Sequence, residues 1–138
     1  MEKNFAVLEV GSFESLLERD AYGLRGKYFI GKELGLTGCE ASLNRLPAGK
    51  STPFVHAHKK NEELYIIVRG CGTFFVDGNE FPVQEGSVVR IDPAGERACK
   101  AGDKGLDYIC IQAQANSLTQ ATREDGFRGQ MKASWMKK

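Results

Sequence analysis

The two histidines of the chain, His56 and His58, are separated by one residue. In an extended segment, residues i and i+2 face the same side, so both imidazoles can reach a single ion at about 2.0–2.2 Å. Glu62 and Glu63 follow at the start of an otherwise apolar segment, where alternation turns one carboxylate inward. A buried carboxylate without a partner is costly, and a metal ion would compensate it.

The pattern therefore predicts a site for one divalent transition-metal ion. Imidazole and carboxylate ligands suit iron, manganese, nickel, copper or zinc, so the residue types leave the metal open. The alternative is a solvent-facing pair of histidines followed by a solvated pair of glutamates.

The spacing around this pair resembles the first motif of the cupin superfamily. Gly49 is followed by six residues, His56-x-His58, four residues, Glu63, six residues and Gly70. The resemblance selects Glu63 over its neighbour as the third ligand. It implies an all-β fold, the cupin jelly-roll β-barrel or double-stranded β-helix, with the metal in the barrel mouth and commonly a homodimer.

A second cupin motif is similar to the stretch from Gly86 through Pro93-Ala94-Gly95. The family pattern implies a fourth ligand, a histidine, three residues after this last glycine, where the chain has Ala98. Two outcomes follow: a three-ligand site with extra open positions, or a barrel that is weakly metallated or metal-free.

Three other side chains come near the missing ligand position. Cys99 is adjacent, but alternation turns it to the face opposite Ala98 unless the strand bulges. Cys110 and Gln112 lie on the last strand and could approach the pocket, although a core or hydrogen-bonding role is commoner for such residues.

The lining of the mouth follows from alternation. Tyr65 and Ile67 share the inward face of Glu63, and Tyr65 is the one candidate catalytic residue, as a hydrogen-bond donor. Arg45 and Arg90 are candidate anion clamps if they point inward. The remaining candidate lining residues are Phe54, Phe74 and Val76, or else Phe75, although core packing is the commoner role for such side chains in a barrel interior.

Short β-prone segments punctuated by Gly and Pro must position these residues. Ser12 is expected to cap a brief helix over residues 12–19. Gly70-Cys71-Gly72 is expected to be a tight connection, and Asp77-Gly78-Asn79 a hairpin turn. The expected strands cover residues 5–10, 27–30, 39–46, 54–58, 63–69, 73–77, 80–83, 87–91 and 106–113.

The 138 residues suit a single cupin domain spanning 1–138. Its core is expected at about residues 40–114, with N-terminal strands and a helix over 1–39 and a C-terminal extension over 115–138. Phe127 and Trp135 indicate that the extension packs on its own barrel or on a partner subunit.

Composition narrows the class of partner. With 19 basic and 18 acidic residues the net charge is +1, which does not favour nucleic acid or an anionic membrane. No apolar run approaches the roughly 20 residues of a membrane span. The first residues lack a secretory pattern, so a cytoplasmic location with reduced cysteines is expected.

Two classes of function follow. One is a metal-dependent enzyme, either an oxidoreductase of the dioxygenase kind or an isomerase, that acts on a small organic molecule. The other is a non-catalytic barrel that binds a small molecule or a metal ion. The histidine–histidine–glutamate trio favours the first, and Ala98 favours the second.

Overall fold

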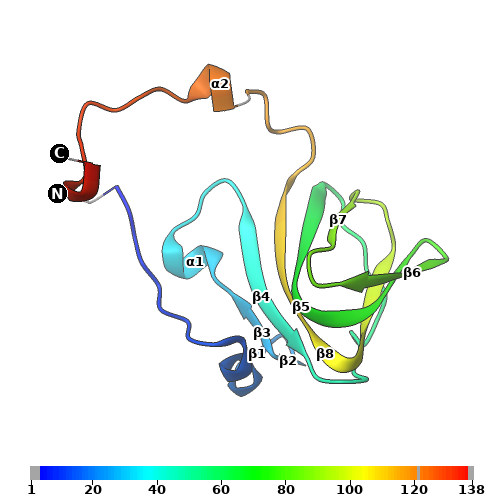
Figure 1. Cartoon of the computed structure of the whole chain (residues 1–138). Helices are drawn as coiled ribbons and strands as arrows, with labels where there is room; N and C mark the ends of the chain where they lie inside the picture. Colours follow the sequence, from blue (N-terminus) through cyan, green and yellow to red (C-terminus); the bar gives the residue numbers. More distant parts are fainter. Residues whose placement is uncertain (1–3, 121, 137–138) are drawn as a thin grey trace.

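The computed structural model describes residues 4–120 and 122–136, and this part of the chain forms eight strands and four short helical segments. Six strands form one curved antiparallel sheet in the order β3-β4-β8-β5-β6, with β7 also paired to β5 (Figure 1). This confirms the expected all-β fold. Their bounds are β3 Lys27–Phe29, β4 Glu40–Leu46, β5 Asn61–Val76, β6 Asn79–Gln84, β7 Val88–Ile91 and β8 Arg97–Gln114.

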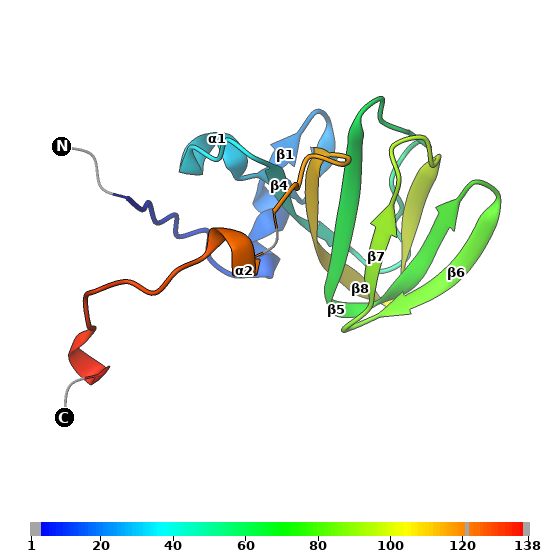
Figure 2. The ribbon, with the colours of Figure 1, turned by 90° about the horizontal axis from the view of Figure 1, so that it is seen from above.

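The barrel is shaped by its two longest strands, β5 and β8, which pair along most of their lengths and bend together (Figure 2). The expected break at residues 70–72 is wrong, because β5 continues through it with register shifts on either side of Gly70. Gly70 has a φ of 90°, and a Cβ there would collide with the carbonyl oxygen of Gly105. Glycine therefore lets the two backbones approach where the strand bends.

The expected hairpin is confirmed, since β5 turns into β6 at Asp77 and Gly78, whose φ values are 51° and 88°. Such left-handed residues match the twist of the flanking strands. The core beneath the hairpin is built from inward-facing side chains of β5, β6, β7 and β8. Its members are Tyr65, Ile67, Phe74, Val83, Ile91, Cys99, Ala101, Leu106, Tyr108 and Cys110.

The N-terminal part is less regular than its sequence indicates. Ser12 caps a 3-10 helix, η1 (Phe13–Glu18), in which Leu16 is fully buried. The strand expected over residues 5–10 is wrong: the structure describes no strand there, and Phe5 and Val7 are exposed. A β-prone run is stabilised as a strand by the packing of its side chains, which these exposed residues lack. The hairpin β1 (Asp20–Ala21) with β2 (Leu24–Arg25) and helix α1 (Gly31–Leu34) follow.

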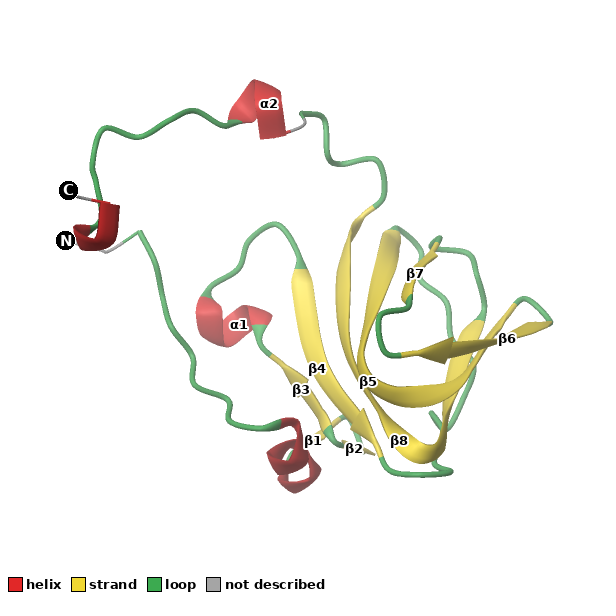
Figure 3. Ribbon diagram, viewed as in Figure 1, coloured by secondary structure: helices red, strands yellow, loops and turns green. Residues whose placement is uncertain are grey.

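The C-terminal extension leaves β8 and runs away from the barrel (Figures 1 and 3). It carries two single turns of helix, α2 (Thr122–Asp125) and η2 (Ser134–Met136). Phe127 and Trp135 are 92% and 81% exposed, so neither packs on its own barrel. None of the helices in the described ranges is long and apolar enough to cross a membrane.

Candidate metal centre

Glu63 stands near the start of β5, between two neighbouring strands. It pairs with Ile91 on β7 and with Gln112 on β8. Its side chain is 4% exposed and lies inside the barrel, as alternation with Tyr65 and Ile67 requires. Glu62 is on the opposite face of the strand and is half-buried.

The two histidines lie on a loop rather than on the expected strand over residues 54–58. His56 forms an isolated bridge with Arg97, in which each backbone N–H donates to the carbonyl of the other at 3.1 and 2.9 Å. The backbone N–H of His58 donates to the carbonyl of Pro93 at 2.8 Å. These bonds hold the loop against the start of β8 and keep both imidazoles on one side.

The ligand atoms of His56, His58 and Glu63 all lie within 4.8 Å of one another. His58 Nε2 is 3.2 Å from a Glu63 carboxylate oxygen, and this nitrogen is buried without a hydrogen-bond partner. Ligands at about 2.1 Å from one ion stand roughly 3.0–3.4 Å apart, so a small rotation of an imidazole completes the fit. The donor set therefore fits a transition-metal ion.

The hydroxyl group of Tyr65 donates a hydrogen bond of 2.8 Å to the other carboxylate oxygen of Glu63. Burial by itself would raise the pKa of Glu63, but this hydrogen bond and the charges of His58 and Arg97 lower it to below its usual value. Tyr65 therefore keeps Glu63 ionised and oriented. A direct catalytic role for Tyr65 stays a prediction.

His56 is suited to offer a nitrogen lone pair. Burial lowers its pKa, and the opposing effect of Glu63 does not restore it. The imidazole is therefore neutral at pH 7, as a metal ligand must be. Its ring lies in edge-to-face contact with the rings of Phe54 and His58, at centroid distances of 6.2 and 5.4 Å.

The side chain that lies next to the trio from the start of β8 is that of Arg97, not that of Ala98. Arg97 is 1% exposed and its Nε lies 3.6 Å from a Glu63 oxygen, whereas Ala98 is half-buried on the other face of β8. The expected alternation between Ala98 and Cys99 is present, but Cys99 is the one that faces the interior. The sequence signal for Arg97 was its period-two relation to Cys99 and Ala101.

The other candidates for a fourth ligand have different roles. Cys110 lines the same cavity, but burial and the nearby Glu63 raise the pKa of its thiol to about 12, so it stays protonated. Gln112 also lines the cavity and accepts a hydrogen bond from Asn61 at 2.9 Å. Burial raises the pKa of Cys99 to about 11.

The trio opens into a cavity of about 590 Å³, within the usual range for small-molecule sites. Phe74 rather than Phe75 contributes from β5. Lys27, which the sequence reasoning missed, enters from β3 and donates to Asn44 Oδ1 at 2.9 Å and to Ser42 Oγ at 3.4 Å. Burial lowers the pKa of Lys27. The sequence pattern that could have indicated Lys27 is its period-two alternation with Phe29.

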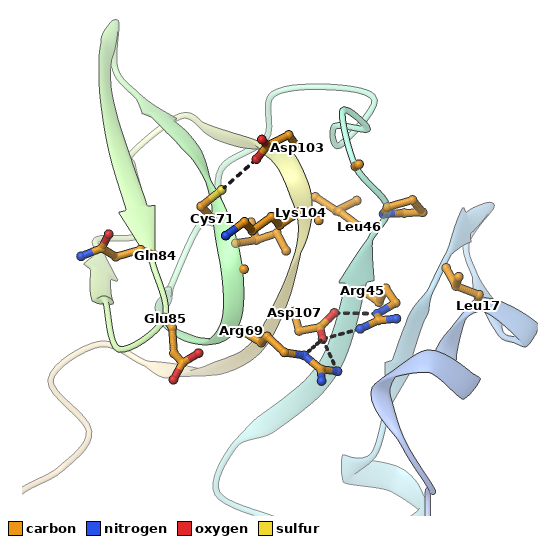
Figure 4. Close-up of a pocket in the computed structure, with 15 residues that line it drawn as sticks. Leu17, Arg45, Leu46, Arg69, Cys71, Gln84, Glu85, Asp103, Lys104 and Asp107 are labelled. Atoms are coloured by element: carbon orange, nitrogen blue, oxygen red, sulfur yellow. Dashed lines mark hydrogen bonds and ion pairs between the residues drawn. The ribbon is translucent and has the colours of Figure 1, made fainter.

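Neither expected arginine clamp is free for a ligand. Arg90 is on the outer surface and pairs with Asp92 at 3.1 Å. Arg45 forms two hydrogen bonds of 2.7 Å with Asp107, and Arg69 donates to the same carboxylate (Figure 4). Arg45, Arg69 and Asp107 line a second cavity, of about 860 Å³. Among the described residues, the two cavities share only Arg45, Leu46 and Pro47, and the second contains no part of the trio.

The chain is similar to a known protein family and to several solved structures. The family model described as the cupin domain matches residues 42–111. A cupin protein from Bacteroides fragilis is 37% identical, with a TM-score of 0.80 over 93% of this chain and 99% of that one. No protein in a search of curated proteins matches the chain.

Two more distant structures share the fold alone. A Cupin 2 conserved barrel domain protein from Salinispora arenicola is 19% identical, with a TM-score of 0.64 over 80% of this chain and 91% of that one. A sugar phosphate isomerase from Silicibacter pomeroyi is 17% identical, with a TM-score of 0.58 over 64% of this chain and 59% of that one.

Proposed function

The chain belongs to the cupin superfamily, and we propose that it binds one divalent transition-metal ion through His56, His58 and Glu63 and takes a small organic molecule into the cavity above them. The observation that carries the proposal is the convergence of the three ligand atoms within 4.8 Å, together with a buried His58 Nε2 that has no hydrogen-bond partner.

Each residue of the centre has a defined part in this proposal. Glu63 supplies the negative charge, His56 and His58 each supply an imidazole nitrogen, and Tyr65 fixes the carboxylate through its 2.8 Å hydrogen bond. Three protein ligands leave coordination positions open toward the cavity. A divalent ion there would act as a Lewis acid toward a donor atom of the bound molecule.

Metal content tests this function directly. Protein purified without chelator, or reloaded with Co²⁺, is expected to hold close to one transition-metal ion per chain by elemental analysis. H58A is expected to lose the ion, because two ligands hold it much more weakly than three. K59A, which changes an exposed neighbour, should keep it. Absence of metal in wild-type protein, together with no uptake on titration, would contradict the proposal.

A second candidate function is a metal-free binding barrel. It is favoured by Arg97, whose buried guanidinium lies 3.6 Å from Glu63 and partly balances that carboxylate without an ion. In this case the cavity would bind its ligand through the protein alone. The metal titration described above separates the two candidates.

We further propose that the chain is a homodimer in which the C-terminal extension packs on the partner. The extension exposes large apolar side chains that find no place on its own barrel, namely Leu118, Phe127, Met131 and Trp135. Such exposure is unusual for a monomer.

Light scattering at micromolar concentration is expected to give twice the 15.2 kDa mass of one chain. A chain ending at residue 116 is expected to give the single mass, because the apolar contacts of the extension are lost. A monomeric full-length protein would contradict the prediction, and so would a truncated chain that stays dimeric.

A further inference from the structure

The cavity above the metal centre is much more positive than the rest of the molecule. The whole chain is nearly neutral, with 19 basic and 18 acidic residues. Among the described residues that line the cavity, Glu63 is the one acidic side chain, and it is a ligand of the proposed ion. The lining cations are Arg25, Lys27, Arg45, Lys50 and Arg97.

The charge of Arg45 is already balanced, because Arg45 is paired with Asp107. Arg25 and Lys50 are exposed, so water screens their charges. Lys27 has only neutral acceptors, Asn44 Oδ1 and Ser42 Oγ, and no carboxylate partner within ion-pair distance is present in the described chain. Lys27 therefore lines the cavity without an ion-pair partner among the described residues, and the one carboxylate whose charge acts on it is that of the proposed ligand Glu63.

Arg97 adds a second, buried positive charge. Two of its nitrogens, Nε and Nη1, are buried and have no hydrogen-bond partner among the described residues, and Nη2 donates to the carbonyl of Asp92 at 3.1 Å. In this part of the chain, Glu63 is the one carboxylate within ion-pair distance, at 3.6 Å. An ion on Glu63 would use that negative charge, which leaves Arg97 uncompensated in a region of low dielectric.

We propose that the ligand of this cavity is a small organic carboxylate whose charged group lies between Lys27 and the metal centre, with Arg97 supplying positive charge from behind. This inference rests on the proposed function, because it names the class of ligand for the same site. Lys27 makes the direct contact, because its ammonium group has a proton to spare beyond its two hydrogen bonds. Phe29 and Phe54 at the mouth provide apolar surface for the body of the ligand.

Phenylacetate and its neutral amide, phenylacetamide, test the inference in metal-loaded and metal-free protein by titration calorimetry. Phenylacetate is expected to bind at least tenfold more tightly than the amide, a difference of about 1.4 kcal/mol. K27M is expected to remove this preference, and K27R to retain it. K100M removes the same charge from an exposed position on β8 outside the cavity and should change nothing.

The inference is overturned if acid and amide bind equally, if the acid does not bind, or if K27M and K100M behave alike. Metal uptake, measured on the same samples, separates this result from the proposed function. Protein that takes up an ion but shows no preference for the acid retains the function and loses the inference. Protein that takes up no ion but prefers the acid through Lys27 supports the inference and contradicts the proposed metal binding.

Discussion

E63Q is expected to weaken metal binding by at least a hundredfold, or about 2.7 kcal/mol. Glu63 is the proposed anionic ligand of the trio, and its carboxylate is held by Tyr65 at 2.8 Å and faced by Arg97 at 3.6 Å. A neutral amide keeps the volume of the side chain but removes its charge. The positive guanidinium of Arg97 would then repel an ion that the carboxylate had attracted.

E62Q is the matched control, since it makes the same change one residue earlier on the opposite face of β5. Metal affinity can be measured by competition with a chromophoric chelator. Thermal unfolding provides a second readout: metal at a hundred times its Kd should stabilise wild type and E62Q by about 2.7 kcal/mol. E63Q should show almost none of this stabilisation. Equal losses in the two variants would contradict the assignment of Glu63 as the ligand.

D107A is expected to lower the free energy of unfolding by about 2–4 kcal/mol. Asp107 is 2% exposed on β8 and joins the strands on both sides, with Arg45 on β4 and Arg69 on β5 (Figure 4). Its loss leaves two arginines without their shared partner. The estimate is below the full cost of breaking a buried ion pair, because both guanidinium groups retain access to water.

Urea unfolding measures this effect, with an unchanged slope showing that stability alone has changed. D103A is the control: Asp103 lines the same cavity but is exposed, so its removal should change stability by no more than about 0.5 kcal/mol. The metal centre lies elsewhere, so D107A should still bind metal when folded. A loss of stability in D107A no larger than that in D103A would contradict the proposed role of Asp107.

Local pattern predicts a large part of the candidate centre. His56 and His58 share one side, and the spacing to Gly70 distinguishes Glu63 from Glu62. Alternation along β5 correctly places Tyr65 and Ile67 inside, because side-chain direction in an extended backbone follows the parity of the position. Parity left Phe74 and Phe75 as alternatives. The structure selects Phe74, because the register shifts around Gly70 change which positions of β5 face inward.

Strand boundaries depend on contacts that a local pattern does not contain. The glycines around residue 70 predict a break between two strands. Because β8 pairs with β5 on both sides of this bend, β5 continues through it. Residues 5–10 have a strand-like composition, yet the structure describes no strand there and leaves Phe5 and Val7 exposed. Residues 54–58 reach their place through the bridge between His56 and Arg97 and remain a loop.

Short-range patterns were enough to predict the all-β architecture, because strands and turns have local periodicities and residue preferences. The resemblance to the first cupin motif then named the three candidate ligands. The charges that surround these ligands became visible only in the folded chain. Arg90, a candidate anion clamp only if it pointed inward, is on the outer surface, whereas Lys27 and Arg97 enter the cavity from β3 and β8. Electrostatic environment is a sum over residues distant in the chain, and only folding brings them within a few ångströms of Glu63.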